Sequence, residues 1–158
     1  HTGDIGVIDE DGFLKITGRK KEIIVNSNGK NIAPAPIESA LKSDPFVGQP
    51  VVIGDRRKFL SCLIVPNFEK LRDWAQKNGL SGLSDDELVE DVRVRQIYQG
   101  IVDRWNEGRP HEQLINAFKL LPRELTIEGG ELTPTLKVKR RIVDKKYESL
   151  IDELYKGD

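Results

Sequence analysis

The chain has one cysteine, Cys62, and no methionine among its 158 residues. A lone cysteine excludes an internal disulfide framework and suits a reducing compartment, so we expect a cytoplasmic protein. No segment approaches the roughly 20 apolar residues that a membrane-spanning helix needs. The polar start, His1-Thr2-Gly3-Asp4, has neither a signal peptide nor an initiator methionine. We therefore expect a fragment of a longer protein.

A strong excess of charge of either sign is also missing. The chain has 25 Lys and Arg against 26 Asp and Glu, which gives a formal net charge of -1. This balance gives no reason to expect nucleic-acid binding or a membrane-surface protein, although a peripheral membrane contact is left open. Apolar residues make up 37% and charged residues 32%, as in ordinary globular domains. The length allows one domain with a single hydrophobic core.

The first half of the chain predicts short strands with one short helix. β-Branched runs bounded by Gly, Asn and Asp favour strands and turns, and prolines favour the first turn of a helix. The predicted elements are a β-hairpin over 5–9 and 13–17, a strand over 23–25, a turn over 26–31, a helix over 37–43, and two core strands over 49–54 and 59–66.

The second half is mainly helical. Asn67 is a predicted N-cap, and Ser84 with Glu87 forms a predicted capping box. A helical period runs from Leu88 through Val92 to Trp105. A further strand is expected over 116–121. The last predicted helix covers 139–155, with these side chains facing inward: Ile142, Val143, Leu150, Ile151 and Leu154. Together these elements indicate an α+β fold, a small sheet with flanking helices preceded by a β-hairpin.

Three polar segments lie at predicted turns, where proteins often present functional groups. In Thr2-Gly3-Asp4 the carboxylate could accept both hydroxyls of a ribose, or the segment could be an ordinary turn. Arg19, in Gly18-Arg19-Lys20-Lys21-Glu22, could bind a hydroxyl or phosphate, or the charges could belong to a solvated loop. Lys137 stands in a hydroxyl-rich loop over 131–141 and could enter a phosphate site; the alternative is a basic surface patch.

Taken in order, these segments resemble the late motifs of the adenylate-forming superfamily, which includes acyl-CoA synthetases, adenylation domains of peptide synthetases and luciferases. The segments over 24–34 and 132–137 look like the long-chain fatty acyl branch. In that branch Thr-Pro-Thr-x-Lys, here Thr133-Pro134-Thr135-Leu136-Lys137, replaces the Thr-Gly-Lys of most relatives. Leu136 therefore departs from the wider superfamily pattern.

The resemblance implies a role for each matching residue. Asp4 is expected to bind the ribose of ATP and of the acyl-adenylate, and Arg19 the ribose or phosphate. Lys21 falls at the hinge between a large N-terminal domain and a small C-terminal domain. Lys137 matches the lysine that is essential for adenylation. After domain rotation, one turn is expected to line the CoA channel: Asn26, Ser27, Asn28 and Gly29.

The same resemblance implies a small mixed sheet and a division into the tail of the adenylation domain over 1–20 and a mobile catalytic domain over 21–158. The expected activity is that of a long-chain fatty-acid–CoA ligase, with fatty acid, ATP and CoA as substrates. Mg²⁺ would be bound mainly by the N-terminal domain, with no metal site in this fragment. The alternatives are another adenylate-forming enzyme or a non-catalytic interaction module.

Some chemically interesting residues are given structural roles. Cys62 is interpreted as a core residue of a strand because no motif histidine accompanies it. His111 is expected to be exposed, and Trp105 to belong to the core with Trp74. The basic run Lys139-Arg140-Arg141 is interpreted as surface or helix-start charge, with contact to a CoA phosphate as the alternative.

Overall fold

The computed structural model describes residues 23–156, so the predicted hairpin over 5–9 and 13–17 lies outside the described residues. The elements are, in chain order, β1 (Ile24–Val25), β2 (Asn31–Ile32), α1 (Pro34–Lys42), β3 (Val47–Ile53), β4 (Leu60–Pro66), α2 (Phe68–Lys77), α3 (Asp85–Leu88), α4 (Val92–Asn106), the 3₁₀ turn η2 (His111–Gln113), β5 (Ile115–Leu120), α5 (Arg140–Lys146) and α6 (Glu148–Leu154).

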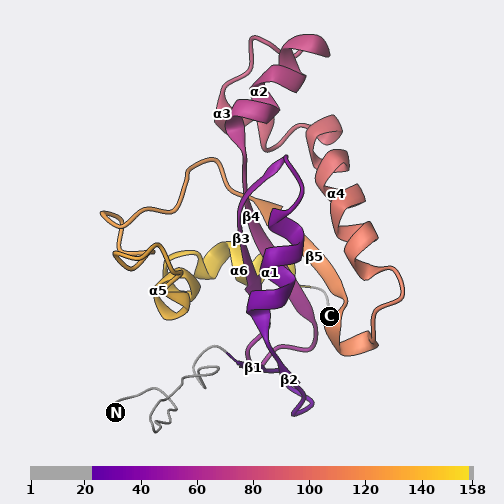
Figure 1. Cartoon of the computed structure of the whole chain (residues 1–158), viewed down its shortest axis with the longest axis vertical. Helices are drawn as coiled ribbons and strands as arrows, with labels where there is room; N and C mark the ends of the chain where they lie inside the picture. The colour runs from indigo at the N-terminus through magenta and orange to yellow at the C-terminus, as the bar shows by residue number, and fades with distance from the viewer. Residues whose placement is uncertain (1–22, 157–158) are drawn as a thin grey trace, which may run out of the picture.

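A three-stranded sheet in the order β3-β4-β5 forms the centre of the fold. β3 runs antiparallel to β4, with Val51 opposite Leu63, and β5 runs parallel to it. Every residue of β4 is buried, which requires cover on both faces of the sheet. Figure 1 shows that cover, with α1 in front of the sheet and α6 behind it. The predicted α+β fold with a small mixed sheet is confirmed.

The core joins the sheet to the helices on both sides. Cys62 is fully buried in β4, and burial raises the pKa of its thiol. This environment confirms the interpretation of Cys62 as a core residue. Trp105 is also buried, and its indole nitrogen donates to the carbonyl of Gln113 at 2.9 Å. Trp74 packs against the same core while remaining partly exposed.

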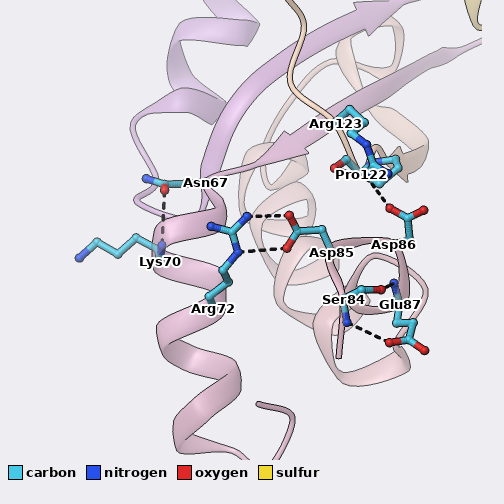
Figure 2. Close-up of polar contacts among 9 residues, drawn as sticks. All are labelled: Asn67, Lys70, Arg72, Ser84, Asp85, Asp86, Glu87, Pro122 and Arg123. Atoms are coloured by element: carbon cyan, nitrogen blue, oxygen red, sulfur yellow. Dashed lines mark hydrogen bonds and ion pairs between the residues drawn. The ribbon is translucent and has the colours of Figure 1, made fainter. Parts of the chain in front are cut away.

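The predicted caps of α2 and α3 are present. The side chain of Asn67 accepts the amide of Lys70, and Ser84 and Glu87 exchange the reciprocal hydrogen bonds of a capping box (Figure 2). These side chains satisfy amides at helix starts that have no partner within the helix. The local sequence therefore determines where both helices begin.

Charged pairs then connect α2, α3 and the segment that follows β5. Arg72 of α2 donates two hydrogen bonds to Asp85 at 3.1 and 2.6 Å, and Arg123 donates to Asp86 (Figure 2). All four side chains are at least a quarter exposed, and exposed ion pairs contribute little to stability. These ion pairs therefore connect α3 to α2 and to the segment after β5 without adding much stability.

The prediction of one helical period from Leu88 to Trp105 is wrong at its start. α3 ends at Leu88 and a new helix, α4, begins at Val92. Asp91 caps α4 by accepting the amides of Arg93 and Val94, and Val92 is 67% exposed rather than inward. The sequence carried the signal for this break, because Asp is a strong N-cap residue.

The single helix predicted over 139–155 is also wrong. The structure divides it into α5 and α6 at Tyr147, whose backbone (φ -108°, ψ 24°) leaves the helical region. Val143 and Ile151 are buried as expected, but Ile142 is 44% exposed. No Gly or Pro marks this break. At this break the hydroxyl of Tyr147 donates to the carboxylate of Glu131 at 3.2 Å.

Among the helices that the structure describes, none combines the length and the apolar character needed to span a bilayer.

Candidate functional site

Lys137 lies in a tight loop between β5 and α5. The amide of Thr133 donates to the carbonyl of Lys137 at 2.8 Å, and the amide of Lys137 donates to the hydroxyl of Thr133 at 3.0 Å. Leu136 adopts a positive φ of 66° and is exposed. Glycine adopts such a φ readily, so this position keeps the local conformation that a Thr-Gly-Lys motif would favour. The threonines and Leu136 together shape the turn that carries Lys137.

The side chain of Lys137 is exposed. Its ammonium makes no ion pair or hydrogen bond within the part of the chain that the structure describes. The loop that bears it extends away from the sheet beside α5 (Figure 1). An exposed cation on a hydrogen-bonded loop can meet an anionic group that approaches from outside this domain.

The base of this loop is held by Glu131, a buried carboxylate. Its side chain accepts hydrogen bonds from the amide of Thr126 at 2.8 Å, from the ammonium of Lys146 and from the hydroxyl of Tyr147 at 3.2 Å. Its backbone carbonyl accepts the amide of Lys139 at 2.7 Å, which closes the loop. Glu131 was included in the predicted loop, but the sequence alone assigned it no role.

Two opposing effects set the pKa of Glu131. Burial raises it, whereas the hydrogen bonds from Lys146, the Thr126 amide and Tyr147 lower it, and the net direction is downward. The carboxylate therefore contributes stability that is fully present above the pKa of an unfolded glutamate. That contribution is lost as the pH falls through the lower, folded-state pKa.

The other end of the loop is fixed by Arg140. Its guanidinium donates two hydrogen bonds to Glu38 of α1, at 2.7 and 2.8 Å, and Glu38 also accepts the amide of Val52 in β3 at 2.8 Å. The side chains of Arg140 and Glu38 are only 20% and 16% exposed. Arg140 is the first residue of α5, as the helix-start interpretation expected, but it is not a surface charge, because the fold brings α1 beside the start of α5. Lys139 and Arg141 are exposed.

The turn between β1 and β2 is held by Asn26. The side-chain oxygen of Asn26 accepts the amides of Asn28 and Lys30, each at 2.9 Å, and the side chain is 7% exposed. Gly29 has a φ of 81°, a conformation that glycine adopts without strain. Ser27, Asn28 and Gly29 are exposed. Asn26 therefore shapes the turn, and its three neighbours are the groups available to a ligand.

The structure does not bring this turn together with the Lys137 loop. In Figure 1 the β1–β2 pair extends at the lower end of the molecule, whereas the loop between β5 and α5 extends at the left. Two different surfaces thus carry the two sets of residues singled out by the sequence. The other predicted site residues, Asp4, Arg19 and Lys21, lie outside the described residues.

A hollow of about 420 Å³ lies between the β3–β4 loop and the helices α5 and α6, and Lys137 does not line it. Its lining carries charges of both signs: Asp55, Arg57, Arg141, Asp144, Lys145 and Glu148. Burial, followed by the nearby charge of Asp55, raises the pKa of Asp144. Between residues 23 and 156, no three His, Cys, Asp or Glu side chains are grouped to hold a metal ion.

Comparison with known proteins identifies the family of this chain. The family described as AMP-binding enzyme C-terminal domain matches residues 21–158. The chain belongs to this family. It is 44% identical over 155 residues to a long-chain-fatty-acid–CoA ligase of Mycobacterium tuberculosis, an alignment that covers 98% of the chain and 26% of the relative. It is 39% identical over 175 residues to a long-chain-fatty-acid–CoA ligase of Rattus norvegicus, covering 98% of the chain and 24% of the relative.

Solved structures show the same fold. The didomain of a carboxylic acid reductase from Segniliparus rugosus, solved in complex with AMP, superposes with a TM-score of 0.66 at 24% identity. This match covers 98% of the chain and 20% of the reductase chain. The chain spans about a quarter of the length of the curated relatives it matches.

Proposed function

We propose that this chain is the C-terminal part of a long-chain fatty-acid–CoA ligase. Residues 1–20 then end the N-terminal adenylation domain, and residues 21–158 form the mobile catalytic domain. The observation that carries the proposal is Lys137: an exposed cation on a loop whose two ends are fixed by Glu131 and Arg140. The 44% identity to a long-chain-fatty-acid–CoA ligase supports the choice of substrate class.

In the first half-reaction the fatty-acid carboxylate attacks the α-phosphorus of ATP, and pyrophosphate leaves. An anion approaches a polyanion, and negative charge develops on the phosphoryl oxygens and on the leaving group. Lys137 supplies a fixed positive charge that stabilises this transition state more than the ground state. It also helps to align the carboxylate for attack. Asp4 binds the ribose hydroxyls, and Arg19 binds the ribose or a phosphate. We assign the binding of Mg²⁺ mainly to the N-terminal domain.

In the second half-reaction the thiol of CoA attacks the acyl carbonyl of the adenylate, and AMP leaves. The domain rotates about Lys21, so Lys137 withdraws and the turn shaped by Asn26 comes to line the CoA channel with its exposed residues Ser27, Asn28 and Gly29. The separation of the turn from the Lys137 loop supports this sequence of events, because one rotation can exchange two different surfaces of one domain at a single site.

ATP–pyrophosphate exchange by the full-length protein, measured across a series of fatty acids, tests the proposed activity. We expect exchange that depends on a long-chain fatty acid, and acyl-CoA when CoA is added. The chain of 158 residues alone should give neither product, because we assign the adenine and acyl sites to the N-terminal domain. Exchange with amino acids or short acids instead would assign the domain to another adenylate-forming enzyme.

Lys21→Pro should separate the two half-reactions. Proline fixes φ and restricts the residue before it, so the rotation about this position should be hindered. We expect ATP–pyrophosphate exchange to survive while CoA-dependent turnover falls. Equal loss of both activities would contradict a hinge role for Lys21 and indicate misfolding or direct catalysis.

A further inference from the structure

The conformation of the Lys137 loop depends on a ladder of hydrogen bonds that starts at Glu131. The carbonyl of Glu131 binds the amide of Lys139, Leu132 forms a bridge with Val138, and Thr133 binds the backbone of Lys137 at two points. Each step pairs one residue before the turn with one after it. A displacement of Glu131 is therefore transmitted along the ladder to Lys137.

The carboxylate of Glu131 fixes the start of this ladder. Glu131 is only 2% exposed, and its side chain binds one backbone amide and two side chains from the α5–α6 junction, Lys146 and Tyr147. Tyr147 lies at the break between α5 and α6. The same carboxylate thus connects the loop to the helices that follow it.

Gly129 makes room for this arrangement. A Cβ atom at position 129 would lie 2.7 Å from Oε1 of Glu131 and 2.9 Å from the hydroxyl of Thr126, both closer than real Cβ contacts. The turn before the loop is therefore shaped around the buried carboxylate. A carboxylate that served only as a solubilising surface charge would need neither this space nor three partners.

Burial of a charged group is costly unless its hydrogen bonds are satisfied, and a well-packed apolar group often stabilises a fold equally well. A buried ionic contact of this kind can instead specify one geometry among several. We infer that Glu131 is a positioning residue for Lys137, holding its loop in the conformation used for adenylate formation. This inference rests on the proposed role of Lys137, and its test separates the two.

Glu131→Gln in the full-length protein keeps the size of the side chain and removes its charge. We expect kcat for adenylate formation to fall by about tenfold to a hundredfold with little change in KM, because a small displacement of a catalytic group can have an effect of that order. The rate of thioester formation from pre-made acyl-adenylate should stay near that of the unsubstituted protein. Glu128→Gln, an exposed position in the same segment, is the matched control and should change neither half-reaction.

Hydrogen exchange gives a readout that does not depend on catalysis. In Glu131→Gln, the amides of Thr133, Lys137 and Lys139 should exchange faster, while the amides of β3 and β4 exchange as before. If Glu131 only stabilised the fold, the amides of the sheet would also exchange faster and both half-reactions would decline together. That result would overturn the inference.

A double variant distinguishes positioning from an independent contribution. If Glu131 acts through Lys137, Glu131→Gln should have almost no further effect on adenylation in a Lys137→Ala background. If the two substitutions lower the adenylation rate by factors that multiply in the double variant, the inference is overturned. Unchanged adenylation in Glu131→Gln alone would overturn it as well. Unchanged adenylation in Lys137→Ala would instead overturn the proposed function.

Lys146→Gln provides a second test if Glu131→Gln does not fold. The side chain of Lys146 is 45% exposed, and its replacement leaves the Thr126 and Tyr147 contacts of Glu131 in place. We expect a loss of about threefold to tenfold in adenylation with no change in thioester formation, smaller than that of Glu131→Gln because two partners remain. Unchanged adenylation in this variant would count against the positioning role.

Discussion

Lys137→Ala in the full-length protein should lower the rate of acyl-adenylate formation by about 10² to 10³, the usual effect of losing one electrostatic contact to a transition state. Thioester formation from pre-made acyl-adenylate should change much less, because we propose that Lys137 has left the site in that step. ATP–pyrophosphate exchange measures the first rate, and release of AMP from added acyl-adenylate and CoA measures the second.

Lys145→Ala is the matched control for this experiment. Lys145 is an exposed lysine of α5 that makes no ion pair among residues 23–156, so its replacement removes the same charge from a nearby surface. The rate of ATP–pyrophosphate exchange should remain close to that of the unsubstituted protein. Full ATP–pyrophosphate exchange in Lys137→Ala would contradict the proposed role of this lysine. An equal loss in both variants would show that net charge near the loop matters rather than Lys137 itself.

Arg140→Met should lower the free energy of unfolding by about 3 kcal/mol, because it leaves the largely buried carboxylate of Glu38 without its cation. Methionine preserves most of the apolar stem, so loss of packing contributes little. The double variant Glu38→Leu/Arg140→Met should be destabilised less than Arg140→Met alone, since no unpaired charge then remains. Chemical denaturation of the chain, followed by circular dichroism, measures both values.

The exposed pair Lys77–Asp73 provides the comparison. Its atoms lie 3.2 Å apart, but the side chains are 73% and 60% exposed. Lys77→Ala should change the free energy of unfolding by less than about 0.5 kcal/mol. An equally small effect of Arg140→Met would mean that the link between α1 and the start of α5 does not contribute to holding the loop.

The unequal burial of these two pairs shows where sequence reasoning stops. Both consist of ordinary charged residues, and Arg140 stands in a basic run that is typical of a surface. Its partner Glu38 is 102 positions away. No local sequence pattern predicts such a pair, because the contact forms only when α1 and α5 pack on the same sheet.

Short-range signals in the sequence predict much of the local structure. The cap at Asn67, the capping box of Ser84 with Glu87 and the strands around Cys62 follow from interactions within a few residues, and the structure contains all of them. The break before Val92 was missed although Asp91 signalled it. The order of motifs also singled out Lys137 and the resemblance to the adenylate-forming superfamily.

The sequence by itself thus determined the α+β class, the starts of α2 and α3 and the loop that carries Lys137, because each depends on local hydrogen bonds or periodicity. Only the tertiary structure decided that Glu131 is buried, that the last helix divides at Tyr147, and that Arg140 joins Glu38. In each case a polar side chain finds its hydrogen-bond partner in another segment of the chain, which packs beside it only in the folded domain. Their energy comes from contacts that exist only once the sheet and its helices have come together.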